Sequence, residues 1–187
     1  MNIPNAITLF RIFLVPIFII FYYLPLGFGH IIAAAIFALA SITDWLDGYL
    51  ARTLQQTSKL GAFLDPVADK LIVAISLVLL TGHLKLPFLP LIASIIIGRE
   101  IVVSALREWM AEIGQRSKIA VCYLGKIKTA VQMVSIIMLL VYRPGITADW
   151  IGISGYLLLC VSALFTLWSM GDYLFSAWKQ YRLRGEV

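Results

Sequence analysis

Six apolar runs, separated by short polar or turn-forming segments, dominate the pattern along the chain. They cover residues 12–26, 31–43, 71–81, 86–98, 130–142 and 151–170. Helix-breaking residues stand between some of the runs, such as Pro25 after the first run and Pro144 before the last. A helix needs about 20 mostly apolar residues to cross a bilayer. The pattern therefore predicts an all-α polytopic membrane protein with six transmembrane helices.

Three inner runs are too short to cross a bilayer unless they extend through charged residues. The second run must continue past Asp44 and Asp47 to about residue 51, and the third must start near residue 61, before Asp65 and Asp69. The fourth run must continue past Arg99. All three extensions point toward the same side of the membrane. We therefore expect the ionisable residues within the helices to gather near one face.

Composition and charge support a membrane protein and indicate its orientation. The chain is 61% hydrophobic and 13% charged, whereas soluble domains are about one quarter charged. This excludes a soluble enzyme, a disordered chain and a nucleic-acid-binding domain. Eight of the 15 Lys and Arg residues lie after the second, fourth or sixth predicted helix, whereas the opposite connections hold only Lys85 and Arg143. The positive-inside rule places both termini in the cytoplasm, and no linker divides residues 1–187 into more than one domain.

Four aspartates lie in the extended parts of the second and third helices. Asp44 and Asp47 are three residues apart, and Asp65 and Asp69 are four apart, so each pair shares a helix face. A short turn joins the two helices as an antiparallel pair, which brings the four carboxylates to one depth. Pro66 should bend the third helix or start a new segment, because proline removes a helical donor.

Four carboxylates near hydrocarbon need compensation for their charge. They could pair with Arg52, Lys70 and Arg99, become protonated in a proton pathway, or bind divalent cations. Their number and helical spacing favour cations, and hard oxygen ligands suit Mg²⁺ or Mn²⁺. Two such ions could clamp a pyrophosphate and stabilise charge as a P–O bond breaks.

The aspartate spacing, D-x2-D-G-x2-A-R-x8-G-x3-D-x3-D, resembles the signature of the CDP-alcohol phosphotransferase family without a departure. The resemblance implies six transmembrane helices around the site and a homodimer. It implies that Asp44, Asp47 and Asp65 hold two metal ions, and that Asp69 is the general base and shares in metal binding. It also places six residues in the cytidine diphosphate site: Asp44, Gly48, Ala51, Arg52, Ser58 and Gly61.

Residues 2–11, 98–109 and 125–129 resemble the members of this family that use sn-glycerol 3-phosphate. The resemblance implies transfer of the phosphatidyl group from CDP-diacylglycerol to sn-glycerol 3-phosphate, with release of CMP, for anionic phospholipid synthesis. It places Thr8 and Arg11 near the acceptor phosphate. It also implies a bacterial inner membrane, with membrane lipid around the protein and the active site facing the cytoplasm.

Basic residues outside the signature suit a phosphorylated acceptor. Arg99 and Arg107 lie eight residues apart, about 80° around a helix, so they share a broad face. With Lys126 on the next helix, these cations could hold a phosphate dianion. Lys126 and Lys128 are about 200° apart and should not both face the site, and the resemblance favours Lys126. The alternative for these residues is contact with anionic lipid or snorkelling to the membrane surface.

Other functions fit part of the pattern. Another member of the same family would use serine or inositol phosphate as acceptor. An intramembrane prenyltransferase also uses aspartates and Mg²⁺ on a diphosphate, although with different motif spacing. An ion or proton transporter predicts carboxylates distributed across the bilayer. The clustering of Asp44, Asp47, Asp65 and Asp69 near one face disfavours transport.

Overall fold

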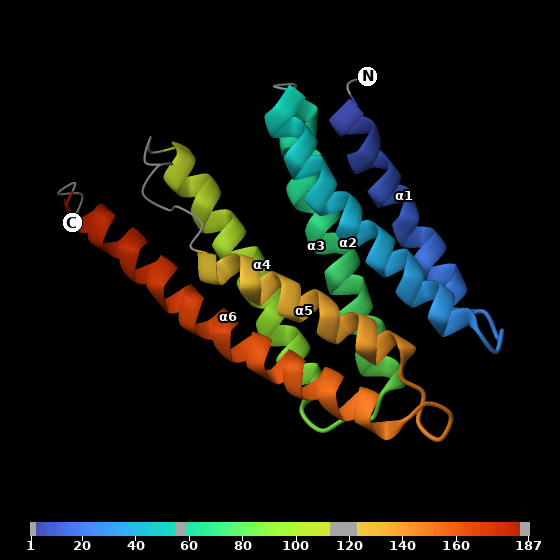
Figure 1. Cartoon of the computed structure of the whole chain (residues 1–187). Helices are drawn as coiled ribbons and strands as arrows, with labels where there is room; N and C mark the ends of the chain where they lie inside the picture. Colours follow the sequence, from blue (N-terminus) through green and yellow to red (C-terminus); the bar gives the residue numbers. More distant parts are fainter. Residues whose placement is uncertain (1–2, 55–58, 113–122, 184–187) are drawn as a thin grey trace.

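The computed structural model describes residues 3–54, 59–112 and 123–183 (Figure 1). Within these ranges, some residues are described by their backbone alone, namely 3–5, 45–54, 59–63, 65, 107, 111–112, 123–127, 172, 176–177 and 179–183. These ranges contain helices and no strand, which confirms the all-α prediction. The helices are α1 (Ile3–Tyr23), α2 (Gly29–Leu54), α3 (Lys59–His83), α4 (Leu89–Glu112), α5 (Tyr123–Val141) and α6 (Asp149–Leu183).

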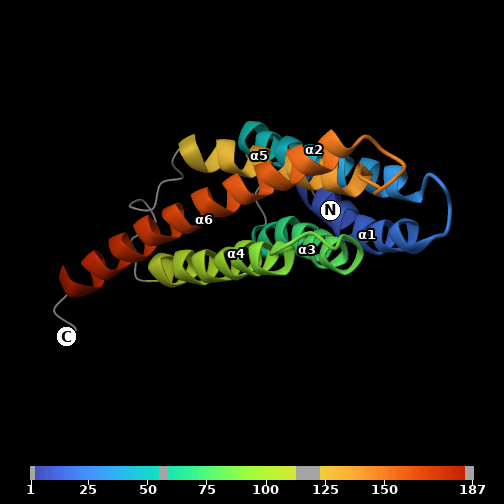
Figure 2. The same ribbon diagram turned by 90° about the horizontal axis from the view of Figure 1, so that it is seen from below.

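The helices form two layers of three. Figure 2 shows α1, α3 and α4 in one layer and α2, α5 and α6 in the other. Within the layers, α3 packs against both α1 and α4, and α5 packs against both α2 and α6. Contacts of α1 with α2 and of α4 with α6 join the layers. Because the chain alternates in direction, the start of α1 and the end of α6 lie at the same end of the bundle (Figure 1).

Within the part of the chain that the structure describes, four helices are long and apolar enough to cross a membrane. Suitable segments occur in α1, α3, α4 and α6, and α2 and α5 contribute the shorter apolar segments Gly29–Asp44 and Lys128–Val141 among these residues. The finding indicates a multi-pass membrane protein, and the count of six spans stays a prediction.

The predicted extensions of the short apolar runs are confirmed. α2 continues to Leu54, α3 begins at Lys59, and α4 passes Arg99 and ends at Glu112. The connection between α2 and α3 is therefore shorter than predicted. α3 also continues through Pro66, which excludes the alternative that a new segment starts there, and a bend at Pro66 stays a prediction. A proline removes a single backbone donor, so the hydrogen bonds of the neighbouring turns keep the helix continuous.

Each helix contributes apolar side chains to the core, whereas other apolar side chains stay on the outside of the bundle. In a bilayer, both locations are apolar, so helix association depends on close packing more than on burial from water. Fully buried examples from α1 to α6 in order are Phe18, Phe37, Leu77, Ile96, Leu139 and Leu159.

Close packing of α5 and α6 depends on two glycines near the start of α6. A Cβ atom on Gly152 would lie 2.6 Å from the ring of Tyr142, and one on Gly155 would lie 3.0 Å from the Cβ of Met138. The Tyr142 hydroxyl also donates to Oδ1 of Asp149 at 3.3 Å. Small residues at these positions allow the two helices to approach.

We predict that Gly152→Ala destabilises the protein and that Gly171→Ala does not. The new methyl group at residue 152 must displace the Tyr142 ring, at a cost of about 1–3 kcal/mol. Gly171 lies on the same helix with no atom within 4 Å of an added Cβ among the residues described, so alanine there should be neutral or stabilise by up to about 1 kcal/mol. Melting temperatures in detergent measure both effects. Equal melting temperatures for the two variants would contradict the prediction.

Candidate active site

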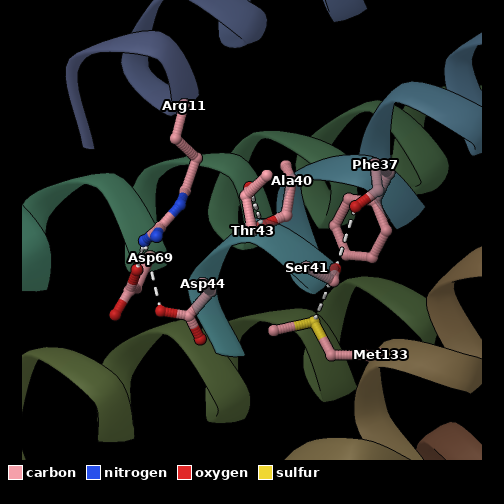
Figure 3. A network of polar contacts seen from close by, with 8 residues as sticks. All are labelled: Arg11, Phe37, Ala40, Ser41, Thr43, Asp44, Asp69 and Met133. Atoms are coloured by element: carbon pink, nitrogen blue, oxygen red, sulfur yellow. Dashed lines mark hydrogen bonds and ion pairs between the residues drawn. The ribbon is translucent and has the colours of Figure 1, made fainter. Parts of the chain in front are cut away.

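A buried arginine joins two of the predicted metal-binding aspartates. Arg11 of α1 donates from Nη1 to Oδ1 of Asp44 on α2 at 3.2 Å and to Oδ1 of Asp69 on α3 (Figure 3). Both contacts are also ion pairs. A single guanidinium nitrogen thus bridges carboxylates from two helices.

These three residues meet because they lie at a common depth. Arg11 is 12 residues before the end of α1, Asp44 is 15 residues after the start of α2, and Asp69 is 14 residues before the end of α3. At 1.5 Å per residue, all three lie about 18–23 Å from the opposite end of the bundle. Since α1 packs against both α2 and α3, their side chains converge.

The arginine and the carboxylates differ in their exposure. The Arg11 side chain is 1% exposed, whereas those of Asp44 and Asp69 are 41% and 38% exposed. Thr8, three residues before Arg11 and on the same face of α1, is fully buried. The guanidinium therefore meets the carboxylates from the protein interior, while part of each carboxylate side chain stays accessible to a ligand.

This donor set fits a divalent cation. Asp44 and Asp69 provide hard oxygen atoms, the ligand type that Mg²⁺ and Mn²⁺ prefer, and their side chains are partly exposed. The side chains of Asp47 and Asp65 lie outside the described part. Among the side chains that are described, no third potential ligand joins the two aspartates, so the predicted cluster of four stays a prediction.

The predicted cytidine diphosphate residues lie on the helix ends next to these aspartates. Gly48, Ala51 and Arg52 are in α2 beyond Asp44, and Gly61 is near the start of α3. Their side-chain surroundings, and Ser58 altogether, lie outside the described part. Their role in nucleotide binding stays a prediction.

Of the predicted acceptor residues, Arg99 is placed in detail. Its side chain is buried, and it donates to Glu100 and, at 3.2 Å, to Oγ of Ser169 on α6. Its Nε has no hydrogen-bond partner among the residues described. Arg107 and Lys126 lie in α4 and α5, and their side chains lie outside the described part.

The pairing of the aspartates with Arg11 was missed by sequence reasoning, which named Arg52, Lys70 and Arg99 as candidate partners. In the structure, Lys70 donates from Nζ to Oγ of Ser104 on α4, and Arg99 pairs with Glu100. The sequence did carry a signal for this pairing. Arg11, Asp44 and Asp69 lie at similar distances along their helices from the turns at the far end of the bundle.

A buried polar strip along α5 was also missed. Lys128, Gln132 and Ser135 are at most 5% exposed, and Oγ of Ser162 on α6 donates to Oε1 of Gln132 at 3.4 Å. The spacing of four and three residues marks one helix face. Lys128 therefore faces the interior of the bundle together with Gln132 and Ser135.

Comparison with known proteins agrees with the aspartate signature. The model of the CDP-alcohol phosphatidyltransferase family matches residues 1–178. Proteins from Salmonella typhimurium, Shigella flexneri and Escherichia coli K12 are each 51% identical to this chain over 176 residues, which cover 94% of both chains. Each of these relatives is named CDP-diacylglycerol–glycerol-3-phosphate 3-phosphatidyltransferase. Because the family match and these identities extend over nearly the whole sequence, the chain belongs to the CDP-alcohol phosphatidyltransferase family.

Proposed function

We propose that this protein transfers the phosphatidyl group of CDP-diacylglycerol to sn-glycerol 3-phosphate, giving phosphatidylglycerophosphate and CMP. The observation that carries the proposal is 51% identity, over 94% of both chains, to enzymes with this activity in their name. The convergence of Asp44 and Asp69 on a positive charge supports it, because the reaction needs a site that holds cations beside a diphosphate.

Asp44, Asp47, Asp65 and Asp69 would hold two divalent cations, Mg²⁺ or Mn²⁺. When bound, such cations neutralise the diphosphate and stabilise charge as its P–O bond breaks. Asp44 and Asp69 approach from neighbouring helices with partly exposed side chains. This arrangement supports a site beside the ends of α2 and α3, with the cytidine diphosphate along Gly48, Ala51, Arg52, Ser58 and Gly61.

Asp69 would act as the general base. It accepts the proton from the C1 hydroxyl of the acceptor, whose oxygen forms a bond to the phosphorus attached to diacylglycerol. The bond from that phosphorus to the bridging oxygen breaks, and CMP leaves with that oxygen. A general base must be within reach of the proton that it accepts, and the 38% exposure of the Asp69 side chain supports such access.

The acceptor phosphate would bind to Arg99, Arg107, Lys126, Thr8 and Arg11. Arg99 supports this assignment best, because its buried guanidinium retains a donor, Nε, with no partner among the residues described. Arginine can bind a phosphate through two parallel hydrogen bonds.

The membrane setting completes the proposal. All six helices would cross a bacterial inner membrane, with both termini and the active site on the cytoplasmic side, and the protein would act as a homodimer. The start of α1 and the end of α6 lie at one end of the bundle (Figure 1). Asp44 and Asp69 lie beyond the midpoint of their helices toward this same end, where the positive-inside rule places the cytoplasm.

Purified protein in liposomes should release CMP from CDP-diacylglycerol and Mg²⁺ when sn-glycerol 3-phosphate is the acceptor. EDTA should stop the reaction, because the proposed cations hold the diphosphate. Serine and inositol phosphate, supplied separately, should give no release. If CMP is released only with serine or only with inositol phosphate, CDP-diacylglycerol remains the donor but the assigned acceptor is wrong. If folded protein releases no CMP with any acceptor, the proposal is overturned.

Asp69→Asn should reduce CMP release by at least about 10²–10⁴-fold, the usual contribution of a general base. Binding of CDP to the variant, measured by calorimetry, should largely survive. Asp149→Asn is the matched control, since Asp149 accepts from Tyr142 at the far end of the bundle, and it should keep normal activity. Turnover at the wild-type rate in Asp69→Asn would rule out this base.

Arg99→Gln should raise the KM for sn-glycerol 3-phosphate by roughly 10–100-fold, as expected when a charged hydrogen bond worth about 1.5–3 kcal/mol is lost. The KM for CDP-diacylglycerol should change little. Arg143→Gln provides the control, because Arg143 donates to the carbonyl of Gly27 at the opposite end. Equal effects of Arg99→Gln on both substrates would indicate a structural role for Arg99.

A further inference from the structure

Arg11 lies against the carboxylates that would hold metal. Its Nη1 contacts Oδ1 of both Asp44 and Asp69, which are separated from it by 33 and 58 positions in the sequence. The Arg11 side chain is 1% exposed, so its charge lies in the interior of the bundle. A buried arginine is stable only where nearby anions compensate it, and these two aspartates supply that compensation.

A divalent cation on Asp44 or Asp69 would share its ligand with the guanidinium. Two positive charges on one carboxylate repel each other, and the repulsion is stronger away from bulk water. Arg11 should therefore weaken the affinity of the aspartates for metal. A diphosphate brings negative charge to the same place and offsets this repulsion.

We propose that Arg11 is a resident counter-ion of the aspartates, which keeps metal binding weak until the nucleotide diphosphate is present. Metal and nucleotide then bind cooperatively, and the coupling is reciprocal by linkage. The inference rests on the proposed function, because it needs the metal site at Asp44 and Asp69. It gives Arg11 a role in loading the site in addition to its proposed contact with the acceptor.

The test is Mn²⁺ binding to the purified full-length protein in detergent, measured by electron paramagnetic resonance with and without CDP. In the wild type, CDP should tighten Mn²⁺ binding by at least about tenfold, within the usual range of coupling between two sites. Arg11→Gln should bind Mn²⁺ alone at least about tenfold more tightly than the wild type, and the effect of CDP should shrink. Arg143→Gln should behave as the wild type.

Arg11→Lys keeps the positive charge and covers the case in which Arg11→Gln does not fold. Its affinity for Mn²⁺ alone should stay within about threefold of the wild type, because the repulsion depends on charge. A tenfold gain for this variant would overturn the inference.

Unchanged or weaker Mn²⁺ binding by folded Arg11→Gln would also overturn the inference, and would leave the proposed function intact if CMP release still needs metal. Absence of Mn²⁺ binding to the wild type, with or without CDP, would instead overturn the metal site of the proposed function, and this coupling with it.

Discussion

The ion pairs of Arg11 with Asp44 and Asp69 join the three helices on which the site depends. A guanidinium that is 1% exposed inside a membrane bundle must be compensated by anions, and the two carboxylates come from different helices. Their mutual attraction therefore fixes the depth of α1 relative to α2 and α3. Removal of both carboxylates would leave the buried guanidinium uncompensated, which is strongly destabilising.

At the opposite end of the bundle, close packing at two glycines holds the helices together in place of ion pairs. Gly152 and Gly155 allow α6 to approach α5, and the Tyr142 ring lies over Gly152. Lipid tails and core side chains are similarly apolar, so contact between helices stabilises the bundle through close fit. The polar end and the tightly packed end thus contribute to the same fold by different interactions.

The sequence by itself determined the all-α class, the approximate position of the helices and the family. These depend on local features, namely the length of apolar runs and the fixed spacing of aspartates between Asp44 and Asp69. The pattern also indicated that α2, α3 and α4 extend through charged residues, which the structure confirms.

Only the tertiary structure decided which side chains meet. The pairing of Arg11 with Asp44 and Asp69 depends on the two-layer arrangement and on the common depth of residues far apart in the sequence. The contact of Arg99 with Ser169 and the burial of Lys128 depend on the rotation of α4 and α5 toward α6. Helical periodicity states which residues share a face, but the neighbour that covers each face is set by packing between helices.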